Sequence, residues 1–385
     1  MTLATEFVGA IRNVVGDAPQ VGLHVPDIGE AEKRFVAECL DSTFVSSVGP
    51  FVTRFEEEIA AFTGAAFAVA VSNGTSALHV SLVLAGVQPG DEVIVPSLSF
   101  IATANAVSHA GATPFFVDSD PTTMGMSPAA LETTLSTLRR TAEGLVDPAT
   151  GNRVSAIVPM HTLGHPADIV GLLAVADAYG LPIVEDAAES LGSWVGDRHT
   201  GTFGLLGVLS FNGNKIVTTG GGGMILTNDP ELARRAKHLT TTAKLPHAWE
   251  FEHDEVAWNY RMPNLNAAMG VAQLTKLEGY LANKREIAAR YASNFADIPG
   301  LTFMAEPAGT TSNYWLCAVR VDGADVSLRD ELLRASNDDG LQARPFWNLL
   351  SEQRMYRTCP KGDLSVATAL HASVISIPSS PAILD

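Results

Sequence analysis

The chain has 385 residues, of which 46% are hydrophobic and 17% charged, and its net charge is −17. This length predicts at least two domains, and the composition is typical of a globular protein. The acidic balance, with no dense basic block, argues against a nucleic-acid-binding protein. We also expect no membrane partner, because no apolar run is long enough to span a bilayer and the N-terminus lacks a signal-peptide pattern. Three scattered cysteines predict reduced thiols in a cytoplasmic protein: Cys39, Cys317 and Cys359.

The first 20 residues show no clear pattern, and we expect them to be loosely ordered. Amphipathic helices are predicted at about 27–41 and 51–62. From residue 67 onward, short apolar strands alternate with helices, which predicts a mostly parallel sheet covered on both faces. The expected strands are 67–71, 92–95, 113–117, 156–159, 183–185, 205–211 and 224–227, and the expected helices are 77–85, 101–109, 128–138 and 169–179.

Beyond about residue 250 this alternation stops. Helices are expected over 267–282, continuing to 295, and over 328–335, mixed with strands at 314–321, 342–345 and 374–378. We therefore predict an α/β protein with a large domain over 21–250 and a smaller C-terminal α+β domain over 251–385.

The stretch from Ser210 to Met224 contains a single lysine, Lys215, followed by four consecutive glycines. Such glycines leave backbone without side chains, so the chain can turn tightly and a bulky group can approach. A partly desolvated lysine can form a Schiff base with a carbonyl compound. A solvated loop lysine beside a flexible turn fits the same fifteen residues, so other parts of the chain must decide.

Several other features also lie at the ends of expected strands. The turn Ser72–Ser76 precedes a helix, an arrangement that can bind an anion but that also describes an ordinary capped helix. Phe100, His161 and Asp186 each follow a further strand. Because ligands of parallel sheets gather at the carboxyl ends of the strands, we predict one site there. A buried aspartate beside a Schiff-base lysine can keep a pyridine nitrogen protonated.

With these motifs in this order, the chain from about Val21 to the C-terminus resembles the type I pyridoxal-phosphate (PLP) enzymes, and within them the sugar aminotransferases of the DegT/DnrJ/EryC1/StrS family. The nearest likeness is the LegC-type branch, which forms 4-amino sugars on a nucleotide carrier. The resemblance implies a type I PLP-dependent transferase fold and a homodimer with shared active sites. It further implies transfer of an amino group from L-glutamate to C4 of a nucleotide-linked 4-keto-6-deoxy sugar, with UDP-4-keto-6-deoxy-N-acetylhexosamine as the expected acceptor.

The resemblance also implies a role for each matching residue. Lys215 forms the Schiff base and shuttles protons, and Asp186 pairs with the pyridine nitrogen. Phe100 stacks on one face of the ring, and Ala188 packs beneath the other. The residues expected at the cofactor phosphate are Gly74, Thr75 and Ser210, with Asn259 reaching the phosphate of the neighbouring subunit's cofactor.

Two positions depart from the family pattern. Glu189 stands where many relatives have a glutamine that contacts the phenolic oxygen of the ring, so it must be protonated there or point elsewhere. Gly221 stands where perosamine-forming relatives usually have glutamate, which favours a UDP-sugar over a GDP-sugar. The alternatives are a GDP-4-keto-6-deoxymannose aminotransferase, or a nucleotide-sugar-binding protein on a catalytically idle PLP fold. A dinucleotide-binding oxidoreductase is disfavoured, because no GxGxxG opens a helix after the first strand.

Three further residues are candidates for substrate binding. A histidine like His161 lines the site in the family, although an ordinary hydrogen-bonded loop histidine fits the same pattern. His165 lies four residues later, but no third ligand is nearby, so no metal site is predicted. Arg261 and Arg344 carry guanidinium groups that suit the donor carboxylate or the sugar diphosphate, and either can equally be a structural ion-pair partner.

Overall fold

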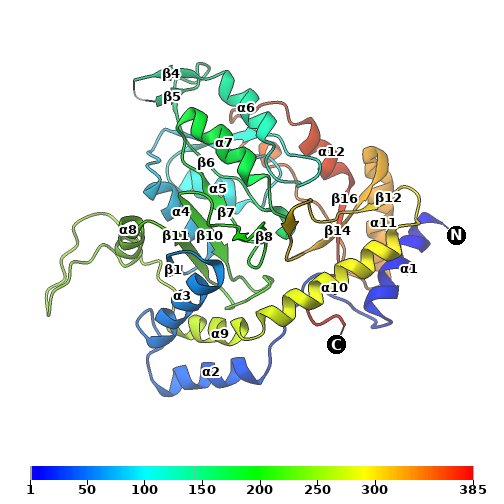
Figure 1. Ribbon diagram of the computed structural model, residues 1–385, viewed down its shortest axis with the longest axis horizontal. Helices are drawn as coiled ribbons and strands as arrows, with labels where there is room; N and C mark the ends of the chain where they lie inside the picture. Colours follow the sequence, from blue (N-terminus) through cyan, green and yellow to red (C-terminus); the bar gives the residue numbers. More distant parts are fainter. Residues whose placement is uncertain (1, 143, 385) are drawn as a thin grey trace.

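The computed structural model describes residues 2–142 and 144–384. A mixed central sheet is built from two strand sets, ordered β1-β11-β10-β7 and β3-β2-β6-β5-β4 (Figure 1). Parallel bridges at Ile157–Ile183 and Met160–Asp186 join the two sets. The strands are β1 (Phe67–Val71), β2 (Glu92–Pro96), β3 (Thr113–Val117), β4 (Arg139–Thr141), β5 (Gly144–Val146), β6 (Arg153–Ile157), β7 (Val184–Asp186), β10 (Leu206–Ser210) and β11 (Gly223–Thr227).

Helices cover both faces of this sheet, as the alternating pattern predicted. In β2, Val93 and Val95 pack in one apolar cluster with α4 and α5, whereas Ile94 packs in another with α6 and α7. Successive side chains of a strand point to opposite faces, so a fully apolar strand needs cover on both sides. Strand β11 runs antiparallel to β1 and β10, which makes the sheet mixed. The helices are α4 (Gly74–Leu84), α5 (Ala102–His109), α6 (Pro128–Ser136), α7 (Ile169–Tyr179) and α8 (Pro230–Thr240).

A second, antiparallel sheet lies at the opposite side of the molecule from α8, in the order β12-β14-β16-β15. Its strands are β12 (Leu301–Phe303), β14 (Cys317–Val321), β15 (Arg344–Pro345) and β16 (Val374–Ile377). Its helices are α10 (Leu277–Phe295), α11 (Val326–Asp338) and α12 (Ser365–Ser373). Together these elements are the smaller α+β unit that the sequence predicted.

The expectation of loose order at the N-terminus was wrong, because helix α1 spans Leu3–Val15. Phe7 and Ile11 are fully buried in the core of the second sheet, and the Phe7 ring lies 5.8 Å from that of Phe295. Arg12 pairs with Asp339 at 2.7 Å. The apolar spacing of residues 7, 10, 11 and 14 suits one face of a helix, and tertiary packing stabilises that helix.

The predicted domain boundary near residue 250 stays a prediction. Helix α9 (Asn264–Leu274) follows it but packs on α2 (Glu30–Asp41) and α3 (Pro50–Thr63). Between α8 and α9, the segment 241–258, here called the arm, extends away from the body (Figure 1). None of the described helices is long and apolar enough to cross a membrane, and cytoplasmic location stays a prediction. Short strands β8 (Trp194–Val195), β9 (Arg198–His199) and β13 (Thr310–Thr311) form a small separate sheet.

Candidate active site

The Lys215 side chain lines a cavity of about 320 Å³ at the ends of strands β7 and β10, here called the lysine cavity. The structure brings together there all the residues predicted to bind the cofactor except Asn259. These lining residues are Gly74, Thr75, Phe100, Asp186, Ala188, Glu189, Ser210 and Lys215. They come from four separate stretches of chain, which meet because β1, β2, β7 and β10 belong to the same central sheet.

The Lys215 amine is held between a carboxylate and an aromatic ring. Its Nζ lies 3.3 Å from Glu189 Oε1 and 3.9 Å from the centre of the Trp315 ring. The backbone N–H of Lys215 donates to Asn212 O at 3.0 Å, which fixes the turn that carries the side chain. Only 12% of the side chain is exposed. The amine is therefore partly desolvated and faces the cavity, as Schiff-base chemistry requires.

Asp186 ends strand β7 and is buried at the base of the lysine cavity. Its Oδ2 accepts a hydrogen bond from Thr103 Oγ1 at 2.8 Å, and its Oδ1 accepts one from Ala188 N at 3.3 Å. Burial raises the pKa of this carboxyl above its usual range, because the interior disfavours the charged form. A protonated pyridine nitrogen beside it would favour the ionised form, so the site fits the role that the resemblance implied.

Glu189 is also buried, and its two oxygens contact different groups. Oε1 faces Lys215, and Oε2 accepts a hydrogen bond from Leu163 N at 2.9 Å. Burial raises the pKa of Glu189 to about 7, although the Lys215 charge acts in the opposite direction. This carboxyl therefore carries a proton for much of its time near neutral pH, which suits contact with an oxygen of a bound cofactor.

The far end of the lysine cavity suits a phosphate group. Helix α4 begins there, so the backbone N–H groups of its first turn and its positive end face the cavity. A Cβ on Gly74 would lie 3.1 Å from the Cβ of Ser210, so glycine leaves room beside that hydroxyl. A Cβ on Gly223 would lie 2.5 Å from the carbonyl carbon of Asn73, which explains one glycine of the run after Lys215. An aldehyde cofactor with a ring nitrogen and a phosphate fits these residues.

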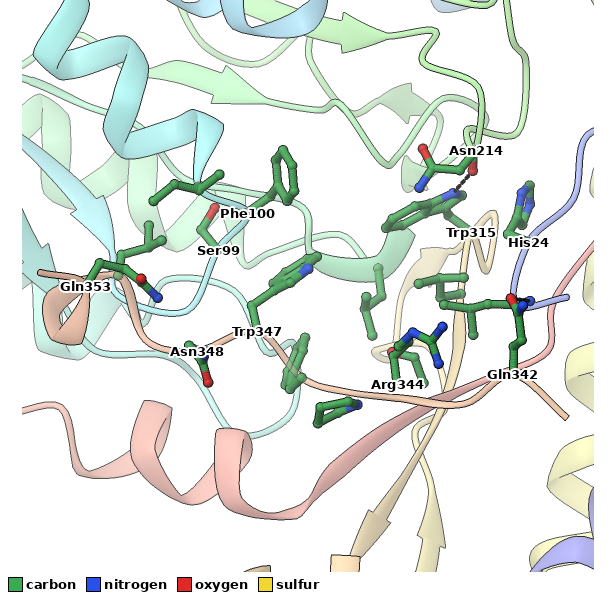
Figure 2. A pocket seen from close by; sticks show the side chains of 18 of the residues that line it. His24, Ser99, Phe100, Asn214, Trp315, Gln342, Arg344, Trp347, Asn348 and Gln353 are labelled. Carbon is green, nitrogen blue, oxygen red and sulfur yellow. Dashed lines mark hydrogen bonds between the residues drawn. The ribbon is translucent and has the colours of Figure 1, made fainter. Parts of the chain in front are cut away.

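A larger cavity of about 750 Å³ adjoins the lysine cavity. Figure 2 shows the side chains that line the larger cavity. The two share the side chains of Phe100, Asn214, Trp315 and Trp347 as walls. Arg344 lines the larger cavity and not the lysine cavity. The other polar side chains around it include His24, Ser99, Gln342, Asn348 and Gln353.

His161 does not line either cavity. Its Nε2 donates to Glu185 Oε2 at 3.0 Å, and its Nδ1 accepts from Ala167 N at 3.1 Å. Because both ring nitrogens are engaged, the ring offers no atom to a substrate or to a metal shared with His165. The link to the site is through the backbone, where His161 N donates to Asp186 O at 3.1 Å.

Arg261 and Asn259 also lie outside both cavities. Arg261 is buried, pairs with Glu56 at 2.6 Å and donates to Ala70 O at 2.7 Å. Within one chain it is therefore a structural ion-pair partner of the central sheet. Asn259 is exposed where the arm returns to the body, and its backbone bridges to Thr241.

Three residues in the lysine cavity region were not predicted from the sequence: Thr103, Trp315 and Trp347. Thr103 follows Phe100 by one helical turn, so the site at the end of β2 could have suggested it. Trp315 donates from Nε1 to Asn214 O at 2.7 Å, and the Trp347 ring lies 6.4 Å from that of Phe100. Both tryptophans come from the C-terminal part of the chain, and no local pattern indicates that they return to Lys215.

Comparison with known proteins agrees with this geometry. The sequence profile of the DegT/DnrJ/EryC1/StrS aminotransferase family matches residues 26–385. The chain is 37% identical to EpsN of Bacillus subtilis, assigned as a pyridoxal phosphate-dependent aminotransferase, over 88% of this chain and 84% of that protein. It is 35% identical to the GDP-perosamine synthase of Caulobacter vibrioides, over 95% and 94%.

A solved structure shows the same fold. The aminotransferase TlmJ from Streptoalloteichus hindustanus superposes with a TM-score of 0.84 at 33% identity, covering 94% of this chain and 93% of that one. With Lys215 and Asp186 facing one cavity on this fold, the chain belongs to the DegT/DnrJ/EryC1/StrS aminotransferase family and is a PLP-dependent sugar aminotransferase.

Proposed function

We propose that the protein transfers the amino group of L-glutamate to C4 of a nucleotide-linked 4-keto-6-deoxy sugar, and that its acceptor is UDP-4-keto-6-deoxy-N-acetylhexosamine. The main support is the pairing of the two cavities: the Lys215 amine faces a small cavity with Asp186, and a larger cavity adjoins it and shares its aromatic walls. If the sugar is held at the shared walls, its C4 ketone carbon would lie beside the Lys215 amine, and the larger cavity would have room for the rest of the acceptor.

The residues of the lysine cavity divide the chemistry between them. PLP, when bound, supplies a reactive carbonyl carbon and a ring that serves as an electron sink. Asp186 holds a proton on the ring nitrogen. The Lys215 amine would hold the cofactor until the substrate amine replaces it, and the freed amine would then move the proton released from the substrate carbon. Glutamate would leave its amino group on the cofactor and, with one water consumed, depart as 2-oxoglutarate. The reverse sequence would pass that amino group to the sugar ketone and return the water. Phe100, Trp315 and Trp347 form the aromatic walls around the reacting atoms.

The larger cavity supports a nucleotide-linked acceptor. It is large enough for a sugar, and its aromatic walls suit the apolar face of a 6-deoxy ring. Arg344 supplies a guanidinium that can bind a diphosphate in a bidentate manner. Gly221, where perosamine-forming relatives usually have glutamate, favours the UDP-linked acceptor.

A second acceptor, GDP-4-keto-6-deoxymannose, is supported by the relatives. Proteins named GDP-perosamine synthase are 35%, 36% and 32% identical to this chain. The test incubates the PLP-loaded enzyme with L-glutamate and then with UDP-, GDP- or dTDP-linked 4-ketosugars, and follows cofactor absorbance and amino-sugar formation. A kcat/KM highest for the UDP-linked acetamido sugar supports the first proposal, and one highest for the GDP-linked sugar supports the second. No absorbance change with glutamate contradicts both.

We further propose that the active enzyme is a homodimer in which Asn259 reaches the cofactor phosphate of the partner subunit. The arm beside Asn259 carries three apolar side chains that are 77%, 78% and 91% exposed in one chain: Trp249, Phe251 and Val256. Exposed apolar groups of this size are characteristic of protein interfaces. A second copy of the chain would cover them in a two-fold arrangement.

Subunit complementation tests this shared site. Lys215→Ala and Asn259→Asp each damage every active site of their own homodimer. If Asn259 acts across the interface, a mixed dimer contains one site with both changes and one intact site. An equal mixture refolded together should recover about a quarter of wild-type activity. Recovery no better than the sum of the two homodimers contradicts the proposal.

A further inference from the structure

His24 lies in a segment that is fixed against the second sheet on both sides of the imidazole. Ser379 N donates to Leu23 O at 2.7 Å, and Val25 N donates to Ser380 Oγ at 2.8 Å. These bonds fix the backbone on both sides of His24, and the burial of its side chain limits how far the ring can move. It lies at the wall of the larger cavity beside Trp315, with ring centres 6.4 Å apart (Figure 2).

The His24 imidazole has two buried nitrogens that nothing in the described chain satisfies. Neither Nδ1 nor Nε2 has a hydrogen-bond partner among residues 2–142 and 144–384. A buried polar atom without a partner is costly, and native proteins rarely retain one unless water or a ligand supplies the bond. By contrast, both ring nitrogens of His161 are engaged. The wall of the larger cavity therefore holds one histidine with unused hydrogen-bonding capacity.

The surroundings of His24 favour its neutral form. Lys284 is buried behind Trp315 and donates to Trp315 O at 3.1 Å and to Ser379 O. Burial, together with the charges of Lys284 and Lys215, lowers the pKa of His24 well below its usual value. A neutral imidazole has one N–H donor and one nitrogen acceptor. It suits an uncharged group that can both donate and accept, and it offers little to a phosphate or a carboxylate.

We propose that His24 is a specificity-determining residue of the acceptor site, where it hydrogen-bonds an uncharged amide or hydroxyl substituent of the nucleotide-linked sugar. This inference rests on the proposed function, because it takes the larger cavity as the acceptor site. The charged part of the acceptor is left to Arg344, on the β15 side of the same cavity. A histidine satisfied only by water is the competing explanation, and it predicts no effect on ligand affinity.

Binding to the PLP-loaded enzyme tests the proposal without requiring turnover. UDP-N-acetylglucosamine, UDP-glucose and UDP alone serve as probes in calorimetry with wild type, His24→Leu and His24→Gln. In His24→Leu, Kd for UDP-N-acetylglucosamine should rise about tenfold, whereas Kd for UDP should stay within about twofold. His24→Gln keeps a donor and an acceptor, so it should recover part of the loss. A larger loss for UDP-N-acetylglucosamine than for UDP-glucose identifies the amide, and equal losses identify a ring hydroxyl.

The control is His371→Leu, because His371 Nδ1 also lacks a partner but lies in α12 and lines neither cavity. It should leave all three Kd values unchanged. Unchanged affinities in His24→Leu, or an equal loss for UDP and UDP-sugars, overturn the assignment of His24. The cofactor absorbance change with L-glutamate is measured separately and should be unaffected in both histidine variants. Its absence in wild type would remove the proposed function, while selective loss of UDP-sugar binding would still uphold the role of His24.

Discussion

The two cavities that meet at Trp315 are built in different ways. The lysine cavity is formed mainly by residues at or just after the ends of strands of the central sheet, such as Asp186 at the end of β7 and Ser210 at the end of β10. The larger cavity takes His24 and Arg344 from segments near the two ends of the chain. If the larger cavity is the acceptor site, cofactor chemistry is placed on the central sheet, whereas acceptor recognition is placed on segments whose residues can be substituted without disturbing that sheet.

The largest effect is expected from Lys215→Ala. Both half-reactions need the Lys215 amine, so activity should fall by about 10³-fold or more with every substrate. The purified variant should also lack the visible absorbance of a lysine-bound cofactor. Stopped-flow absorbance with glutamate, and then with ketosugar, measures the two halves separately. If only the acceptor half were lost, the division between the cavities would be wrong.

Asp186→Asn should also slow both half-reactions, by about 100-fold. Asparagine keeps the shape of the side chain but cannot stabilise a positive charge on the ring nitrogen. Thr103→Val serves as the matched control, because it removes a hydrogen bond to Asp186 but leaves the carboxyl group in place. Its effect should be clearly smaller. Single-turnover rates with glutamate give the comparison, and equal effects of the two variants would contradict the assigned role of Asp186.

Arg344→Ala should affect one half-reaction alone. Loss of a guanidinium that binds the diphosphate should raise KM for the nucleotide sugar about tenfold and leave the glutamate half-reaction nearly unchanged. Arg344→Lys keeps the charge but not the planar fork, so its effect should be intermediate. A rise in KM for L-glutamate would instead indicate that Arg344 binds the donor carboxylate. Both cavities would then take part in the glutamate half-reaction.

The smallest effect is a pH dependence of stability that belongs to Glu189. The folded protein raises the pKa of Glu189 to about 7, so between the ordinary value of 4.5 and about 7 it retains a proton that the unfolded chain has lost. The stability of the apoprotein should therefore fall as pH rises through this window. Glu189→Gln has no carboxyl group to titrate, so it should not lose stability in this way. Its Tm should therefore exceed that of wild type by more at pH 8 than at pH 4.5. A constant difference, measured by thermal denaturation, would contradict the raised pKa.

The two cavities also differ in how far they could be predicted from the sequence. The strand ends carrying Phe100, Asp186 and Lys215 were recognisable, because apolar strands alternate with helices and the site of a parallel sheet lies at one edge. The roles of Gly74 and Ser210 came from the family resemblance, and the structure places both in the lysine cavity. Local pattern and sheet topology therefore located the lysine cavity, whereas the cofactor and the residue roles came from the family resemblance.

The larger cavity could not be predicted in this way. His24 and Trp315 are nearly 300 residues apart in the sequence, and their contact depends on how two distant segments pack. Arg261, by contrast, was predicted to be a candidate substrate-binding residue but lines neither cavity. Its residue type suited a ligand, but Glu56 lies 2.6 Å away in the fold and neutralises it. Residue type indicates what a side chain can bind, whereas tertiary packing decides which partner it has.

Helix α1 has a consequence for how the protein is made. It is synthesised well before α10 and α11, on which it packs, because most of the described chain lies between them. At typical rates of translation, Phe7 and Ile11 are synthesised on the order of tens of seconds before the helices that bury them. During synthesis this stripe is open to chaperones, and a nascent chain released before α11 would leave it permanently exposed.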